Sequence, residues 1–177
     1  SDLLYHELAA YKQRTGVPVV AVLMGLAASG GYYVSLPADR IVAHPTTVTG
    51  SVGVIFLQPK VDGLMAKIGV GVDVAKSGER NDMGSPFRPS TPEEQRLIQD
   101  LTVGLGQRFT DLVARHRKIE GSARAEVASA RVFLAPEALK LGLVDEIGYL
   151  PDGFAAARHL AGLPADARVV AYRRSKY

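Results

Sequence analysis

The amino-acid sequence predicts an α/β fold with a mainly parallel sheet, and three observations lead to this expectation. Short runs of β-branched residues alternate along the chain with segments whose apolar residues recur at helical spacing. Clusters with glycine or proline separate these segments, as turns do. The 177 residues are 47% hydrophobic and 22% charged, a composition that can bury one core. We therefore expect residues 1–177 to form a single domain in which helices cover the sheet.

The expected elements follow from local patterns in the sequence. The most apolar run, residues 17–24, follows the turn signal Thr15-Gly16 and predicts a strand buried on both faces. Further strands are expected at residues 40–43, 52–56, 70–74, 144–147 and 168–172. Helices are expected at residues 1–11, 32–37, 61–68 and 136–141, and after Thr91 and Pro151. The polar residues 79–90 contain glycine and proline and predict a surface loop.

The helix after Thr91 has the clearest signals. Thr91 and Glu94 have the spacing of a capping box, and Pro92 fits the first helical position. An apolar stripe then recurs over several turns, at Leu97, Leu101, Leu105, Phe109 and Leu112. Such a stripe faces either a core or a subunit interface, and the sequence leaves both possibilities open.

Composition excludes several classes of function. The net charge is only +3, and the basic clusters at residues 115–118 and 173–176 fit a solvated helix end and a tail, so we expect no nucleic-acid partner. The chain has no cysteine, hence no disulfide, thiol nucleophile or cysteine metal site. No ligand cluster of recognisable spacing and no phosphate-binding loop occurs, so neither a metal nor a cofactor is expected. No apolar run is long enough to cross a membrane, and we expect the chain itself to be soluble.

A serine among small residues follows the most apolar run. Ser29 lies between Ala27-Ala28 and Gly30-Gly31, where the chain can turn sharply from a strand into a helix. This pattern is related to the nucleophile elbow, with Ala27 in place of the usual first glycine. The plainer alternative is that Ser29 only caps the following helix.

A nucleophilic serine needs a base, and the sequence offers histidine or lysine. His44 is the histidine nearest to Ser29 along the chain, and no carboxylate that would orient it is evident. Lys76 follows the valine-rich residues 70–74, which would supply the apolar setting that keeps a lysine uncharged. Spacing alone favours an ordinary exposed lysine. The polar residues 79–82 beside it are expected to be structural or solvated.

Four stretches together resemble one family. They are AASGGYY at residues 27–33, TGSVGVI at 49–55, KSG at 76–78, and RVF at 131–133 continuing to LGLVDEIG at 141–148. In this order they resemble signal peptide peptidase A, a family of serine peptidases. The resemblance implies a crotonase-like or Clp protease-like fold, built of repeated β-β-α units with a mostly parallel sheet and outer helices.

The resemblance also implies roles for individual residues. Ser29 corresponds to the nucleophile, Lys76 to the general base, and Ser51 to the serine that orients the lysine. The Gly30 N–H follows the nucleophile at the helix start and is our candidate oxyanion donor. The expected reaction is peptide hydrolysis through an acyl-enzyme formed on Ser29.

Substrate, assembly and location are likewise implied by the resemblance. The family cleaves remnant signal peptides and other extended hydrophobic peptides, and forms homo-oligomers, as a tetramer or octamer, with composite substrate grooves. It is bound to the bacterial cytoplasmic membrane with an extracytoplasmic catalytic domain. Family members carry upstream strands, a glycine-rich oxyanion loop and a membrane anchor before the position of residue 1. We therefore expect this chain to be a peptidase catalytic domain that lacks those parts.

Two other classes of function remain open at this stage. A crotonase-like acyl-CoA enzyme would share the fold but would not need a Ser29/Lys76 pair, and coenzyme A binding would favour it. A non-catalytic peptide-binding or assembly subunit would bind peptide without a reactive serine.

Overall fold

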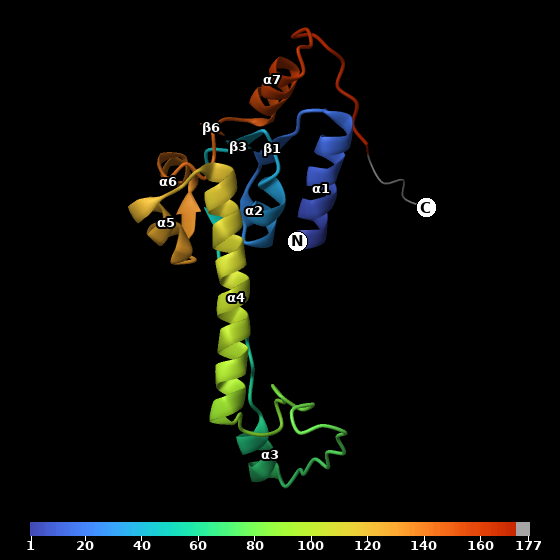
Figure 1. Ribbon diagram of the computed structural model, residues 1–177, viewed down its shortest axis with the longest axis vertical. Helices are drawn as coiled ribbons and strands as arrows, with labels where there is room; N and C mark the ends of the chain where they lie inside the picture. The colour runs from blue at the N-terminus through green and yellow to red at the C-terminus, as the bar shows by residue number, and fades with distance from the viewer. Residues whose placement is uncertain (173–177) are drawn as a thin grey trace. The chain divides into compact units, whose positions relative to one another are not determined.

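The computed structural model describes residues 1–172, which form two compact units (Figure 1). The first unit contains residues 1–52 and those from Phe109 onward, and the second contains residues 53–108. The elements in chain order are α1 (Asp2–Thr15), β1 (Val20–Leu23), β2 (Leu26–Ala28), α2 (Gly30–Ser35), β3 (Arg40–Ala43), β4 (Val48–Gly50), α3 (Asp62–Ile68), α4 (Pro92–Arg117), α5 (Gly121–Ala128), β5 (Val132–Leu134), α6 (Ala135–Lys140), β6 (Glu146–Ile147) and α7 (Leu150–Leu160).

Two small sheets form the centre of the first unit. β3 lies between β1 and β6, and both pairings are parallel. In the second sheet, β4 lies between β2 and β5; it is parallel to β2 and antiparallel to β5. The α/β class and the mainly parallel pairing predicted from the sequence are therefore confirmed. Because parallel neighbours end at the same edge, the chain leaves β2 and β4 side by side.

The first unit has a continuous hydrophobic core. Tyr32 and Tyr33 of α2 are buried in it, and the Tyr32 hydroxyl donates a hydrogen bond of 2.7 Å to the Leu143 carbonyl. The Tyr33 ring contacts Tyr5 of α1 at 5.5 Å and Phe109 of α4 at 4.7 Å between ring centroids. α1 and α2 thus lie side by side (Figure 1). These contacts fix α2, and with it the residue that precedes α2.

The second unit is organised differently. It contains α3, the first part of α4, and long segments without regular structure at residues 53–61 and 69–91. Among the described residues, the buried hydrophobic side chains all belong to the first unit. The one buried residue at 53–108 is Glu94, which is 5% exposed. Polar contacts therefore have an unusually large share in ordering the second unit.

Most helices, and the strand at residues 40–43, occur where the sequence predicts them. The strands predicted at 52–56, 70–74 and 168–172 are wrong, because these residues have no regular structure. Val70, Val72 and Val74 have the alternation of a strand, yet they are about half exposed, and no strand within the described residues pairs with them. The basic cluster at residues 173–176 lies outside the described residues.

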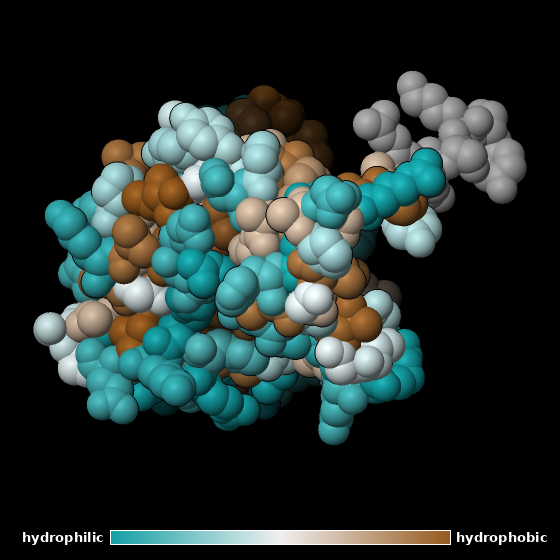
Figure 2. Space-filling model, turned by 90° about the horizontal axis from the view of Figure 1, so that it is seen from above, coloured by the Kyte–Doolittle hydropathy of each residue, from teal (hydrophilic) through white to brown (hydrophobic). Residues whose placement is uncertain are grey.

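Hydrophobic residues lie among hydrophilic ones on the face shown in Figure 2. The longest helix, α4, has 26 residues, and it carries charged residues near both of its ends. Within residues 1–172, no helix has both the length and the apolar character needed to span a membrane.

The capping box predicted at the start of α4 is confirmed. The Thr91 N–H donates to the Glu94 carboxylate at 2.8 Å, and the Glu94 N–H donates to the Thr91 hydroxyl at 3.2 Å. Both bonds satisfy N–H groups that a helix start leaves without an intrahelical partner.

We expect Thr91→Ala to destabilise the start of α4 by about 1 kcal/mol, because the Glu94 N–H loses its acceptor. Hydrogen exchange of the amides in the first turn should become about fivefold faster. Thr102→Ala is a matched control, since the Thr102 hydroxyl bonds only to the Ile98 carbonyl of the same helix. Equal protection in both variants would contradict the capping role.

Candidate active site

Ser29 stands at a strained turn between β2 and α2. Its backbone has φ 50° and ψ −116°, a region that residues other than glycine seldom adopt. Its N–H donates to the Gly50 carbonyl at 2.8 Å, and its own carbonyl accepts the Tyr33 N–H at 2.8 Å. The side chain is exposed and makes no capping hydrogen bond. Ser29 therefore occupies the cap position, but its hydroxyl is not used for capping.

Ser51 occupies the equivalent place on the neighbouring strand. Ala28 of β2 pairs with Gly50 of β4, so Ser29 and Ser51 are the first residues beyond the paired ends. Ser51 also has a positive φ, 51°, and its N–H donates to the Arg131 carbonyl at 2.9 Å. Two serines in strained conformations thus lie at one edge of the same parallel strand pair, roughly 5 Å apart at the backbone.

The start of α2 presents backbone N–H groups beside Ser29. The first helical bond runs from the Tyr33 N–H, so the N–H groups of residues 30–32 have no partner within the helix. A Cβ built at position 30 would meet only the Ser1 side chain, whose hydroxyl can rotate away. The structure therefore brings Ser29, Ser51 and Gly30 of the sequence-predicted site together, and an anion near Ser29 would meet unpaired donors.

Lys76 belongs to the second unit and has a polar setting there. Its Nζ donates to the Glu79 carbonyl at 2.9 Å and to Oδ1 of Asp82 at 2.8 Å. The side chain of Lys76 is 35% exposed, and that of Asp82 only 14%. The apolar setting predicted from the valine-rich residues 70–74 is wrong, because these valines are exposed and form no strand. An ion pair holds this amine instead.

Asp82 continues the ion pair into a larger network. Arg88 donates to Asp82 at 2.7 Å and to both oxygens of Glu94, the capping residue of α4. Hydrogen bonds from Arg88 and Lys76 hold the pKa of Asp82 well below its usual range. Hydrogen bonds from Arg88 and from the Thr91 N–H lower the pKa of Glu94 to about 2. The sequence predicts Asp82 to be structural or solvated and does not single out Arg88, because no local spacing signals this network.

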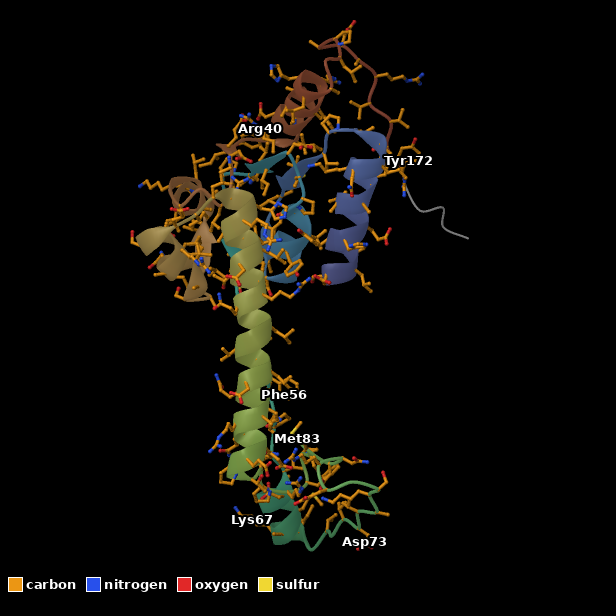
Figure 3. All side chains as sticks on the ribbon, viewed as in Figure 1. Arg40, Phe56, Lys67, Asp73, Met83 and Tyr172 are labelled. Atoms are coloured by element: carbon orange, nitrogen blue, oxygen red, sulfur yellow. The ribbon has the colours of Figure 1, made fainter. Side chains whose placement is uncertain are left out.

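Each unit contains a hollow whose lining does not include Ser29. One, of about 550 Å³, lies in the second unit between the 72–75 segment and the loop at 81–87; its walls include Asp73 and Met83, both labelled in Figure 3. Another, of about 280 Å³, lies in the first unit between α7 and the residues Arg40 and Glu146.

His44 is not placed to serve Ser29. Its Nδ1 lies 2.9 Å from the Thr46 hydroxyl, and its ring packs edge-on against Tyr149. His44 precedes β4, whereas Ser29 and Ser51 follow the opposite ends of β2 and β4. The strand pair therefore separates the histidine from the serines, and lysine remains the candidate base.

Comparison with solved structures defines the class of fold. An enoyl-CoA hydratase/isomerase from Mycobacterium abscessus aligns with a TM-score of 0.50 at 20% identity, over 93% of this chain and 46% of that one. The protein has a crotonase-like α/β fold. In this chain the strained Ser29 directly follows the parallel strand β2. At this identity the likeness shows the fold alone.

The sequence itself identifies the family. The model of Peptidase family S49 matches residues 11–164, and the chain belongs to this family. It is 38% identical to Protease 4 of Salmonella typhi over 164 residues, 92% of this chain. It is 33% identical to the chloroplastic serine protease SPPA of Arabidopsis thaliana over 177 residues, 99% of this chain. The chain spans 26% of the length of each relative.

Proposed function

We propose that the chain is the catalytic domain of a serine endopeptidase that uses a Ser29/Lys76 dyad. The observation that carries the proposal is the exposed hydroxyl of Ser29, held in a strained turn at a helix start beside unpaired N–H groups. Membership of Peptidase family S49 and the protease names of the relatives support the same reaction.

The proposed reaction begins with uncharged Lys76, which takes the proton of the Ser29 hydroxyl. The Ser29 oxygen attacks the peptide carbonyl, and the Gly30 N–H donates to the oxyanion that forms. The C–N bond then breaks, and the protonated amine of Lys76 returns its proton to the leaving amine. Water activated by the same lysine releases the acyl group and regenerates Ser29. Ser51 orients the lysine amine and does not react.

The proposed substrates are remnant signal peptides and other extended hydrophobic peptides. Small and aliphatic residues around the Ser29 turn favour an apolar side chain before the cleaved bond. We further propose that the chain works as a homo-oligomer, a tetramer or octamer. The full-length protein would be held at the bacterial cytoplasmic membrane through a segment outside this chain, with its catalytic domain on the extracytoplasmic side.

A serine-directed phosphonate tests the proposed nucleophile. We expect intact mass to increase by one phosphonyl group, with the modification on the peptide that contains Ser29. Lys76→Ala should label at least 100-fold more slowly, since general-base assistance contributes about that factor or more. Labelling that persists in Ser29→Ala would refute the assignment. Peptide binding without labelling would select the non-catalytic alternative.

A further inference from the structure

Arg131 begins the RVF stretch of the sequence, to which the proposed function assigns no role. It directly precedes β5, and its carbonyl accepts the Ser51 N–H at 2.9 Å. This bond lies one residue beyond the last antiparallel pair of β4 and β5, which joins Gly50 to Val132. Arg131 is therefore the backbone partner of Ser51, the strained residue at the same sheet edge as Ser29.

The side chain of Arg131 is held by three neighbours in the first unit. Its Nε donates to the Glu126 carboxylate of α5 at 2.5 Å, and a terminal nitrogen donates to the Glu137 carboxylate of α6 at 3.3 Å. The guanidinium lies over the ring of Phe133, 4.1 Å from its centroid. Phe133 is 1% exposed, so this ring is fixed in the core. A planar guanidinium can make these contacts at once, which a lysine amine cannot.

These contacts restrain the backbone of residue 131 more than they add stability. Each ion pair alone contributes little, because Arg131 and both glutamates are nearly half exposed. Together they join the residue to two helices and to the core. Both backbone neighbours need such a restraint, since Ala130 has φ 61° and Ser51 has φ 51°. Strained conformations of this kind persist only where the surrounding contacts hold them.

We infer that Arg131 is a positioning residue, whose side chain fixes the carbonyl that holds Ser51 in its strained conformation beside Ser29. The inference rests on the proposed function for its effect on catalysis, in which Ser51 orients the base. All the contacts that carry it lie within the first unit. If the Arg131 carbonyl shifts, the Ser51 backbone can relax, and the direction of the Ser51 hydroxyl changes with it.

Amide hydrogen exchange of the full chain tests the positioning directly. In Arg131→Gln the Ser51 amide should exchange about 10-fold faster, because its acceptor is no longer held in place. The Tyr33 amide, a reporter from α2 of the same unit, should keep its rate. Arg124→Gln is the matched control, since Arg124 is 45% exposed, Arg131 is 44% exposed, and Arg124 pairs with Asp111 of α4 instead. Both amides should exchange normally in this control.

Steady-state hydrolysis of a hydrophobic peptide tests the catalytic consequence. Arg131→Gln should lower kcat by about 10-fold and change KM by less than about twofold, because the orienting serine moves while the substrate contacts stay. Arg131→Lys should recover part of kcat and part of the Ser51 protection. Its ammonium can still pair with Glu126 or lie over the Phe133 ring, but it cannot make all three contacts.

Three results would overturn the inference. Unchanged exchange at Ser51 in Arg131→Gln would mean that the side chain does not hold the carbonyl. Equal acceleration at Ser51 and Tyr33 would indicate a general loss of stability, which a merely structural residue also causes. Faster exchange at Ser51 with an unchanged kcat would remove the link to catalysis. Failure of the proposed function looks different: the phosphonate would not label Ser29 in the unaltered chain, whereas the exchange comparison would still decide whether Arg131 holds Ser51.

Discussion

Ser29→Ala is expected to lower kcat/KM for peptide hydrolysis by at least about 10⁴-fold, because it removes the atom that forms the acyl-enzyme. Substrate binding should change little, since the hydroxyl makes no capping bond and the N–H groups of α2 remain. Steady-state hydrolysis of a hydrophobic fluorogenic peptide measures the first effect, and peptide affinity measured by anisotropy measures the second.

Lys76→Ala and Ser51→Ala complete this comparison. If Ser29 and Lys76 act as a unit, the double variant that combines Ser29→Ala and Lys76→Ala should hydrolyse peptide no more slowly than either single variant, because the effects of such residues are not additive. Ser51→Ala should retain measurable activity, since an orienting residue does not react. Ser122→Ala, an exposed serine of α5, controls for the loss of a hydroxyl at the surface. Normal turnover in Ser29→Ala would remove the basis for a serine peptidase.

The sequence predicts the fold class well, because strong local signals specify most of the helices. The capping box at Thr91 begins a helix. The left-handed glycines at positions 16 and 69 end two other helices. The short strands β2, β4 and β5, of three residues each, are not predicted. Runs of that length carry no periodicity, and only the pairing between distant segments reveals them.

The candidate site is predicted in part, and the reason differs for each residue. Small residues around Ser29 indicate a sharp turn, and the structure confirms a helix start there. The strained Ser51 follows from the register of β4 between β2 and β5, which no local pattern encodes. The alternating valines before Lys76 suggest a strand. Such alternation shows only that one face of the segment could be buried, and here no neighbouring strand or helix of the described residues covers that face.

Asp82 and Arg88 illustrate a different limit. Both are charged residues in a polar loop, where most side chains are solvated and carry little energy. Their importance arises because Arg88 joins the loop to a buried glutamate at a helix cap. Glu94 is predictable as a capping residue, whereas the ion pair that it makes with a residue outside the helix is not. The Asp82–Arg88–Glu94 network can therefore be identified only from a structure in which the loop at residues 76–88 contacts the start of α4.

Gly50 is the residue on which the arrangement of both serines depends. It ends β4 with φ +83°, its carbonyl accepts the Ser29 N–H, and Ser51 follows it directly. A Cβ at this position would lie 2.5 Å from the Phe133 ring and 3.1 Å from the Arg131 carbonyl. Phe133 is 1% exposed and lies in the core, so neither the ring nor the β5 backbone has room to move away.

Gly50→Ala is therefore expected to destabilise the first unit by about 2 to 4 kcal/mol, as the sum of two costs. The left-handed backbone costs an alanine about 1 kcal/mol, and overpacking against Phe133 adds about 1 to 3 kcal/mol. Urea unfolding followed by circular dichroism measures the change. Any relief of the overlap must shift β4, so kcat/KM of the remaining folded protein should fall by about 10-fold or more.

Gly16→Ala separates these two costs. Gly16 has a similar φ, +66°, at the end of α1, and nothing lies within 4 Å of a Cβ built there. The free energy of unfolding of this variant should fall by only about 1 kcal/mol, because the alanine must adopt the left-handed backbone conformation but collides with nothing. Its kcat/KM should stay unchanged. Equal losses in the two variants would mean that β4 accommodates a methyl group beside Phe133. The geometry of Ser29 and Ser51 would then not depend on close packing at Gly50.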